Sequence, residues 1–278
     1  QKGIDENVEL YKNWNGAGDG RFKVMMGPHA PYTCPPDYIK KVRDVAEKYD
    51  MPIHIHLSET KGEVENCENE YHMTPIALMD SLGLFERPTL AAHCVHVTDD
   101  DIRIMKEKHI AVAHNPASNL KLASGIAPVP KMRKAGITVG IGTDGASSNN
   151  KLDMFAEMRL TALIHKAANY DPFAITAKEA VDMATRDGAK CLGYDNLGEL
   201  KEGYLADIIL VDRSGFHWKP RFDSVSLAVY AGNSMDVDTV IINGKPVMEH
   251  KELLTIDTER MDAEVKRVTE KLYAFTKK

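Results

Sequence analysis

The stretch IHIHLSET, residues 53–60, begins like a buried strand and ends in polar residues. Residues two apart in a strand share a face, so the isoleucines lie on one face and His54 and His56 on the other. We expect the isoleucine face to contact covering helices, with His54 one layer deeper than His56. Glu59 follows three residues after His56, just past the expected end of the strand. The stretch therefore predicts a strand that delivers reactive side chains at its carboxyl end.

The same pattern recurs along the first half of the chain, where four further apolar runs end in polar residues. Lysine- and glutamate-rich stretches separate them, and this alternation predicts a parallel sheet covered by helices. The runs are Phe22 to Gly27 before His29, Leu90 to Ala92 before His93, Ile110 to Ala113 before His114, and Ile137 to Gly142 before Thr143 and Asp144. The expected helices are Pro36 to Tyr49, Pro75 to Leu82, Thr98 to Lys108 and Pro128 to Lys134.

Two kinds of parallel sheet place their ligands at the carboxyl ends of the strands, the (β/α)8 barrel and the doubly wound sheet. No GxGxxG or phosphate-binding loop follows any of the runs, which disfavours the nucleotide-binding forms of the doubly wound sheet. A complete barrel needs eight strands and about 250 residues. Residues 1–145 offer five, so we expect either a smaller fold or three further strands upstream of Gln1.

The chain changes character after residue 150. Two helices are expected over Met154 to Ala168 and Ala177 to Ala189. Asn243-Gly244 between two apolar runs predicts a β-hairpin, and a charged helix is expected at about 257–275. We predict three parts: residues 1–195 as the C-terminal part of a barrel, 196–250 as a small β domain, and 251–278 as a C-terminal helix.

The composition excludes several classes of protein. The 278 residues carry a net charge of -6 with no basic cluster, which argues against a nucleic-acid partner. No apolar run reaches the roughly 18 residues that a membrane span requires, and no signal-peptide pattern is visible. The four cysteines are scattered without CxxC spacing, which favours a reducing, cytoplasmic compartment.

His56, His93 and Asp144 end three strands of one predicted sheet, so in a barrel they converge on one pocket. Two imidazoles and a carboxylate are good ligands for zinc or iron(II). Gly140 and Gly142 precede Asp144 at two-residue spacing and are expected to leave space beneath it. Polar residues also gather at strand ends because loops are wet, but five strands ending this way favour a functional site. The histidines expected to be solvated are His72, His109, His165, His217 and His250.

These motifs, in this order, resemble the metal-dependent amidohydrolase superfamily, and within it the 5-methylthioadenosine/S-adenosylhomocysteine deaminases. The resemblance covers nearly the whole chain. The motifs that carry it are Gly27 to Tyr32, His54 to Thr60, Ala92 to His96, His114-Asn115-Pro116 with Ser118-Asn119, Gly142 to Gly145, Ser147 to Asn150 with Leu152 to Phe155, and Gly198 to Asp212.

The resemblance assigns roles residue by residue. His56 matches the metal ligand of strand five, and Asp144 matches the metal ligand of strand eight that takes a proton from the attacking water. Glu59 matches the carboxylate that moves protons to the purine ring. His93 matches the histidine of strand six that positions or polarises the attacked group, and His29 a substrate-contacting histidine of strand four. His29, Glu59 and Asp144 are therefore the expected substrate-binding residues, and the expected cofactor is one divalent metal ion, zinc.

The fold implied is an α/β (β/α)8 TIM-type barrel, with strands four to eight present and the first strands missing, a small β-sandwich domain and a C-terminal helix. The implied activity is hydrolytic deamination of an adenine nucleoside such as 5'-methylthioadenosine or S-adenosylhomocysteine. A guanine or triazine-type deaminase or chlorohydrolase, and an inactive truncated chain, are the alternatives. The family's His-x-His pair of strand one has no counterpart upstream of Gly27, so we expect a piece of a longer enzyme. The expected partners are a small-molecule nucleoside and further copies in a homo-oligomer.

Overall fold

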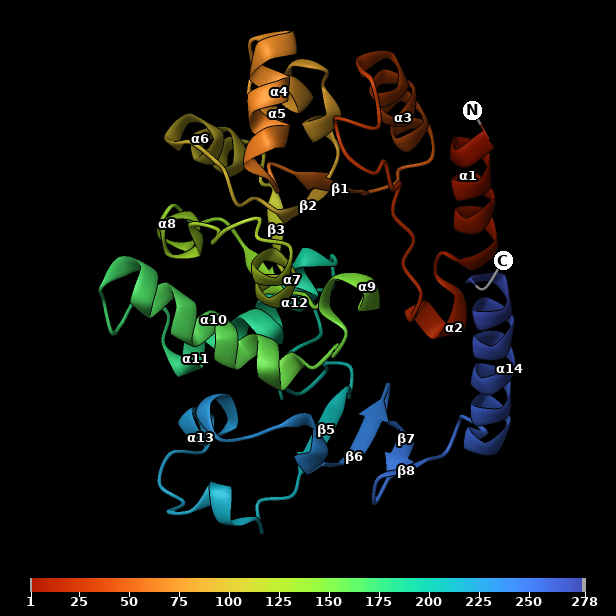
Figure 1. The fold of residues 1–278 in the computed structure, drawn as a ribbon, viewed down its shortest axis with the longest axis vertical. Helices are drawn as coiled ribbons and strands as arrows, with labels where there is room; N and C mark the ends of the chain where they lie inside the picture. The colour runs from red at the N-terminus through yellow and green to blue at the C-terminus, as the bar shows by residue number, and fades with distance from the viewer. Residues whose placement is uncertain (1, 277–278) are drawn as a thin grey trace.

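The protein is described by a computed structural model that covers residues 2–276. Within this part of the chain, strands form a parallel sheet of order β1-β2-β3-β4 and an antiparallel sheet of order β5-β6-β7-β8. The two sheets occupy different regions of the molecule (Figure 1). The strands are β1 (Ile53–Leu57), β2 (Thr89–His93), β3 (Ala111–His114), β4 (Val139–Ile141), β5 (Ile208–Val211), β6 (Val237–Ile242), β7 (Lys245–Glu249) and β8 (Glu252–Leu253).

Helices precede, separate and follow the strands of the parallel sheet, as the alternating pattern predicts. Those up to β4 are α1 (Lys2–Trp14), α2 (Ala17–Gly20), α3 (Pro36–Lys48), α4 (Lys61–Tyr71), α5 (Pro75–Ser81), the 3-10 helix η1 (Leu84–Glu86), α6 (Asp99–Glu107), α7 (Pro116–Lys121) and α8 (Val129–Lys134). Those after β4 are α9 (Ala146–Asn149), α10 (Met154–Asn169), α11 (Ala177–Ala184), α12 (Arg186–Cys191), η2 (Phe216–Trp218), α13 (Ser224–Tyr230), η3 (Ser234–Asp236) and α14 (Thr258–Thr276).

Most predicted elements form close to their expected ends, but two differ. The helix expected over 177–189 is broken into α11 and α12 at Thr185, whose φ of -123° and ψ of -92° are not helical. The strand expected over 22–27 is reduced to one parallel bridge between Met26 and Ile53. Beside that bridge, the side chain of Asn7 in α1 bonds to Met25 and Gly27, so a helix meets this edge of the sheet.

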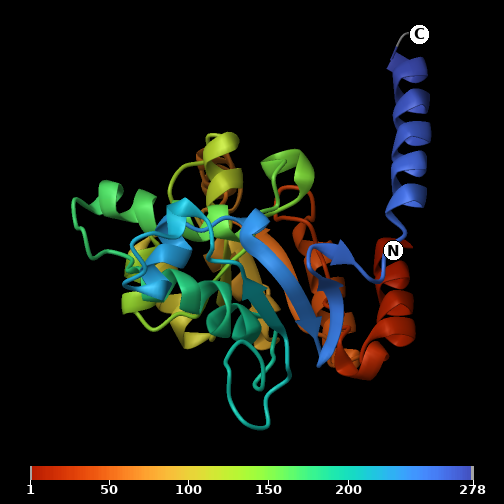
Figure 2. The same ribbon diagram turned by 90° about the horizontal axis from the view of Figure 1, so that it is seen from below.

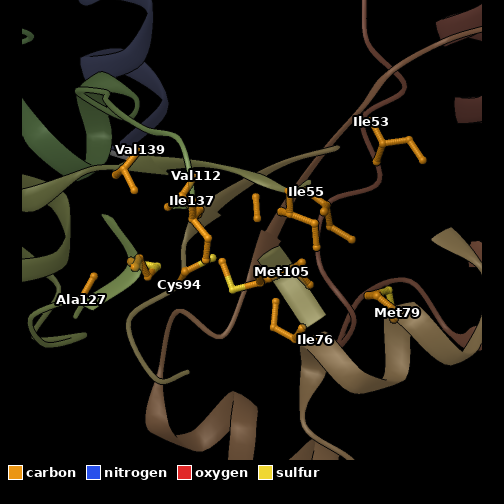
Figure 3. Packing of buried hydrophobic residues seen from close by; sticks show 14 of the residues in the cluster. Ile53, Ile55, Ile76, Met79, Cys94, Met105, Val112, Ala127, Ile137 and Val139 are labelled. Carbon is orange, nitrogen blue, oxygen red and sulfur yellow. The ribbon is translucent and has the colours of Figure 1, made fainter. Parts of the chain in front are cut away.

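The outer face of the parallel sheet forms the core. Ile55, Ala91, Val112 and Val139 lie side by side in the register of β1 to β4, and all four are buried. Figure 3 shows Ile55, Val112 and Val139 of this row in the same cluster as side chains from the covering helices, such as Ile76 and Met105. Burying an aliphatic side chain of this size contributes about 1.5–3 kcal/mol relative to exposure. The isoleucine face of residues 53–57 therefore faces the helices, as predicted.

On the inner face of the parallel sheet, the positions level with His56 in the neighbouring strands are small residues. In the register His56 is followed by Ala92, Ala113 and Gly140. Gly140 and Gly142 were expected to leave space beneath Asp144, and both have close neighbours. A Cβ on Gly140 would lie 3.0 Å from the Cα of Gly188 in α12, and one on Gly142 would lie 2.4 Å from the side-chain oxygen of Asn115. The glycines thus admit neighbouring groups closely, and both also line a pocket of about 480 Å³ beside α12.

The C-terminal third combines the antiparallel sheet with helices. The predicted hairpin forms between β6 and β7 around Asn243-Gly244, where both residues have positive φ. α13 lies between β5 and β6 in sequence but packs on α10 and α11. The boundaries proposed for a separate small β domain stay a prediction.

α14 stands apart from the rest of the molecule (Figure 2), and all its residues are exposed. Its bounds agree with the charged helix predicted for about 257–275. In the described residues, 2–276, no helix combines the length and the apolar character needed to cross a bilayer.

Candidate active site

Three histidines from separate segments meet at the carboxyl edge of the parallel sheet. The rings of His29 and His56 have centroids 4.9 Å apart, and those of His56 and His93 stack at 5.3 Å with an interplanar angle of 20°. The backbone N–H of His56 donates to the carbonyl oxygen of His29 at 3.0 Å. Of the three residues expected to converge, His56 and His93 lie together, and Asp144 is near enough that both lower its pKa. His54 shares the inner face with His56 but is exposed.

His93 reaches this cluster through an unusual backbone conformation. In the register it lies beside Leu57, which is buried on the helix-facing side of the sheet. His93 and Cys94 have φ values of 71° and 48°, in the left-handed region that non-glycine residues rarely adopt. The chain turns there, and the ring of His93 stacks on His56 instead of following Leu57.

Glu59 lies next to His93 and is held by the loop around it. Its Oε2 is 3.8 Å from Nε2 of His93, and its Oε1 accepts from the hydroxyl of Ser124 at 3.4 Å. Glu63 fixes the loop because its carboxylate accepts from the backbone N–H groups of Ser58 and Glu59 at 2.9 and 2.8 Å. Burial raises the pKa of Glu63 and outweighs these hydrogen bonds, which lower it.

Asp144 is the carboxylate that follows β4. Its Oδ2 accepts from the hydroxyl of Ser118 at 2.6 Å, and its Oδ1 accepts from the backbone N–H of Gly145 at 2.6 Å. Burial alone would raise the pKa of Asp144, but these bonds, with the nearby His93 and His56, bring it below its usual value. Asp144 is therefore ionised at neutral pH, as a proton acceptor or metal ligand must be.

His29 lies at the rim of the cluster and is exposed. Its Nδ1 is 2.8 Å from the hydroxyl of Thr33, and the ring of Tyr32 meets it edge-on at 5.7 Å. This leaves the other ring nitrogen available to a ligand. The position agrees with the substrate contact that the resemblance implies.

His114, which ends β3, does not join the site. It is fully buried on the outer face, with its Nε2 3.2 Å from Nε2 of His165 in α10. His165 was expected to be solvated, and that prediction is wrong because it is also fully buried. Burial, followed by the neighbouring His165 and His93, lowers the pKa of His114 well below its usual value. Burial, with a smaller effect of Lys166, lowers the pKa of His165 to about 4.

Several residues that hold the site had no role from the sequence. Ser118 bonds to Asp144, and Asn119 bonds to Nδ1 of His93 through Oδ1 at 2.8 Å. Both lie in α7, within a motif that the family resemblance already included. Glu63 could have been found from Thr60, which caps α4 by accepting from the N–H of Glu63 at 3.1 Å. That spacing is typical of a helix start.

The donor set for a metal ion consists of one nitrogen and one carboxylate. Nδ1 of His56 is 2.7 Å from the carbonyl oxygen of His29, so Nδ1 carries the proton and Nε2 keeps its lone pair. A backbone carbonyl that fixes the tautomer is the usual outer partner of a metal-binding histidine. The described residues, 2–276, contain no group of three or more histidine, cysteine, aspartate or glutamate side chains arranged to hold a metal. His56 and Asp144 thus fit a metal ion as part of its ligand set.

A parallel α/β sheet with histidines, a glutamate and an aspartate at its carboxyl edge has the layout of an α/β enzyme. Comparison with known proteins makes this specific, because the model of the amidohydrolase family matches residues 3–247. The chain belongs to the amidohydrolase family. This confirms the resemblance inferred from the motifs.

Curated relatives cover nearly the whole chain. The protein from Dictyoglomus thermophilum is 53% identical over 264 residues, and that from Pelotomaculum thermopropionicum is 51% identical over 267 residues. Both carry the name 5-methylthioadenosine/S-adenosylhomocysteine deaminase. The matches take in 95% and 96% of this chain and 62% of each relative. The chain therefore spans about three fifths of the length of these relatives.

Solved structures show the same fold. An adenosine deaminase from Xanthomonas campestris with bound zinc matches with a TM-score of 0.93 and 35% identity, over 98% of this chain and 62% of its own. The atrazine chlorohydrolase of Arthrobacter aurescens complexed with zinc matches with a TM-score of 0.88 and 29% identity, over 95% and 59%. These matches confirm the predicted α/β barrel class.

Proposed function

We propose that this chain carries the catalytic residues for hydrolytic deamination of an adenine nucleoside such as 5'-methylthioadenosine or S-adenosylhomocysteine. The observation that carries the proposal is the proximity of Glu59 to His93, with Oε2 and Nε2 3.8 Å apart, beside an ionised Asp144. The names of relatives about half identical in sequence support the choice of substrate.

The reaction exchanges the C6–N bond of the adenine ring for a C6–O bond. Glu59 in its protonated form donates its proton to ring nitrogen N1, which removes the resistance of the aromatic ring to attack. Asp144 accepts a proton from the water that attacks C6. The leaving nitrogen takes up the proton held by Asp144 and departs as ammonia. Glu59 recovers a proton from the C6 hydroxyl as the C6=O bond forms, and the product is the inosine-type nucleoside. General acids and bases placed in this way contribute about 10²–10⁴-fold each.

We further propose that one divalent ion, zinc, completes the site, held by His56 and Asp144 among its ligands. Solved relatives that contain zinc support this. When bound, zinc would supply Lewis acidity that makes water acidic enough to react at neutral pH. His29, at the exposed rim, would contact the substrate together with Glu59 and Asp144.

The test is ammonia release from a panel of 5'-methylthioadenosine, S-adenosylhomocysteine, adenosine and guanine. We expect E59Q to lower turnover on the adenine nucleosides by about 10²–10⁴-fold while zinc content stays unchanged. Glu68→Gln, an exposed glutamate of α4, is the matched control and should keep full turnover. Near-normal turnover of Glu59→Gln, or no ammonia from any adenine nucleoside with the unmodified chain, would refute the proposal.

Triazine hydrolysis is the second candidate. It is favoured by the TM-score of 0.88 to the atrazine chlorohydrolase, although the identity there is 29% against 53% for the first deaminase relative. Chloride release from atrazine, measured beside ammonia release from 5'-methylthioadenosine, separates the two activities.

We also propose a cytoplasmic location and no nucleic-acid or membrane partner. The four cysteines, Cys34, Cys67, Cys94 and Cys191, are free thiols, which supports a reducing compartment. The homo-oligomer expected from the family resemblance stays a prediction.

A further inference from the structure

We propose that Asn119 is a positioning residue that sets the tautomer of His93, so that Nε2 of His93 is a hydrogen-bond acceptor inside the site. The tautomer itself does not depend on any activity. Its consequence for catalysis rests on the deaminase function proposed above.

The contact between the two side chains is buried and short. Nδ1 of His93 lies 2.8 Å from Oδ1 of Asn119, and each residue is 1% exposed. An amide oxygen only accepts, so the proton of this hydrogen bond resides on Nδ1. In a neutral imidazole the other nitrogen then has a free lone pair. Nε2 of His93 is therefore an acceptor.

Asn119 is well placed to impose this choice because its own backbone is fixed. Its N–H donates to the carbonyl of Asn115 at 3.0 Å, and its carbonyl accepts from the N–H of Ser124 at 2.8 Å. Ser118, the preceding residue, bonds to Asp144. The first turns of α7 therefore orient two reactive groups, the imidazole of His93 and the carboxylate of Asp144.

The accepting nitrogen faces Glu59, whose Oε2 is 3.8 Å away. A neutral His93 in this tautomer cannot donate a hydrogen bond to the group under attack. It can instead accept one from the attacking water and direct the water's oxygen lone pair toward C6. His93 becomes a donor only after a proton has moved to Nε2. This differs from the polarising role that the family resemblance allows, because the resting histidine orients the nucleophile.

The direct test is the imidazole nitrogen spectrum of the chain labelled with ¹⁵N-histidine, with His93 assigned by its loss in His93→Gln. We expect a protonated Nδ1 and an unprotonated Nε2 in the unmodified chain. Asn119→Leu, which removes the acceptor at nearly constant volume, should shift His93 toward a mixture of tautomers. Asn119→Asp, which keeps an accepting oxygen, should retain the original one.

A protonated Nε2 in the unmodified chain would overturn the proposal, either because Nδ1 then accepts from the amide nitrogen of Asn119 or because the ring is doubly protonated beside Glu59. The same tautomer in Asn119→Leu would overturn it as well. The first measurement uses His93→Gln only to assign the signal and does not depend on Asn119→Leu, so the test survives if Asn119→Leu fails to fold. Asn169→Leu is the control, since Asn169 bonds to the backbone of His165 and not to the site.

Kinetics separate this proposal from the proposed function. On 5'-methylthioadenosine we expect Asn119→Leu to lower kcat by roughly 10–100-fold, the usual effect of losing an outer partner of a site histidine, with KM nearly unchanged. Asn119→Asp should recover most of the loss. Absence of deaminase activity in the unmodified chain refutes the function and leaves the tautomer result standing. Full kcat with an altered tautomer would refute the positioning role.

Discussion

His93 and His114 end neighbouring strands, yet they have opposite surroundings. In the parallel register His93 lies beside Leu57 and His114 beside Ile141, so both would face the helices if their strands ended regularly. His114 does so and pairs with His165 in α10. His93 has a φ of 71° and stacks on His56 in the site. One backbone dihedral therefore separates a site histidine from a core histidine.

This comparison shows that residues with a left-handed backbone conformation direct the reactive groups at this edge of the sheet. Ser58 after β1, His93 at the end of β2 and Asp144 after β4 have φ values of 51°, 71° and 60°. Each such residue costs of order 1–3 kcal/mol, and conformations of this kind persist where surrounding contacts hold them. Here the hydrogen bonds of Glu63, Asn119 and Ser118 provide those contacts.

The largest expected effect is the loss of turnover in His93→Gln, compared with the same substitution at His114. His93→Gln should lower turnover on 5'-methylthioadenosine by about 10²–10⁴-fold, because it removes a group inside the site. His114→Gln should leave kcat nearly unchanged and lower the urea midpoint, because it disturbs a buried pair. Equal losses of turnover in the two variants would erase the proposed distinction.

The buried pair should make the protein sensitive to acid. The pKa of His165 is about 4 in the folded chain, below the unfolded value of roughly 6.5, so the unfolded state binds the proton first as pH falls. The stability is fully present above pH 6.5 and is lost as the pH falls toward 4, by roughly 3 kcal/mol. Urea titrations across this range measure the slope. His165→Leu should reduce this slope, with the remainder carried by the buried His114, and an unchanged slope would show that His165 does not contribute to the acid response.

Removing one member of the His114–His165 pair should lower the free energy of unfolding, whereas removing both should leave it almost unchanged. His165→Leu leaves Nε2 of His114 buried without its partner, which costs about 1–3 kcal/mol. The double variant with His114→Leu removes both polar groups and should be close to neutral. The free energies of unfolding of His165→Leu, His114→Leu and the double variant, each compared with the unmodified chain, form a double-mutant cycle. Additive losses would mean that the two rings are not coupled.

The smallest effect is expected at Ser58, where β1 uses the same backbone device as His93. Glycine adopts positive φ without the roughly 1–2 kcal/mol penalty of other residues, and the hydroxyl of Ser58 is buried without a partner. S58G should raise the free energy of unfolding by about 0.5–1 kcal/mol after the entropy cost of glycine. Ser81→Gly, at the end of helix α5, is the control and should lower it. A loss of stability in Ser58→Gly would show that the left-handed turn is not strained.

Sequence patterns were sufficient to predict most of the helices and strands and several residues of the site. Apolar alternation in 53–57 predicted which face of β1 meets the helices, and Asn243-Gly244 predicted the hairpin. The rule that reactive residues follow the strands predicted that His56 and His93 lie together, as they do. The sequence offered His114 only as the polar end of its run and did not predict its burial on the outer face. It also left His165 in solvent, since a helix pattern alone does not show which face of α10 is covered.

By itself the sequence determined the order of strands and helices, the apolar face of the parallel sheet, and the carboxyl edge as the place of the site. These follow from local periodicity, which depends on neighbours a few residues apart. Only the tertiary structure decided that His93 turns inward, that Asn119 and Ser118 hold the reactive groups, and that His114 pairs with His165. Those outcomes depend on contacts between residues about 26 to 51 positions apart and on positive φ angles that those contacts stabilise. No short window of sequence contains both partners, so the choice of face at each strand end is made by the fold.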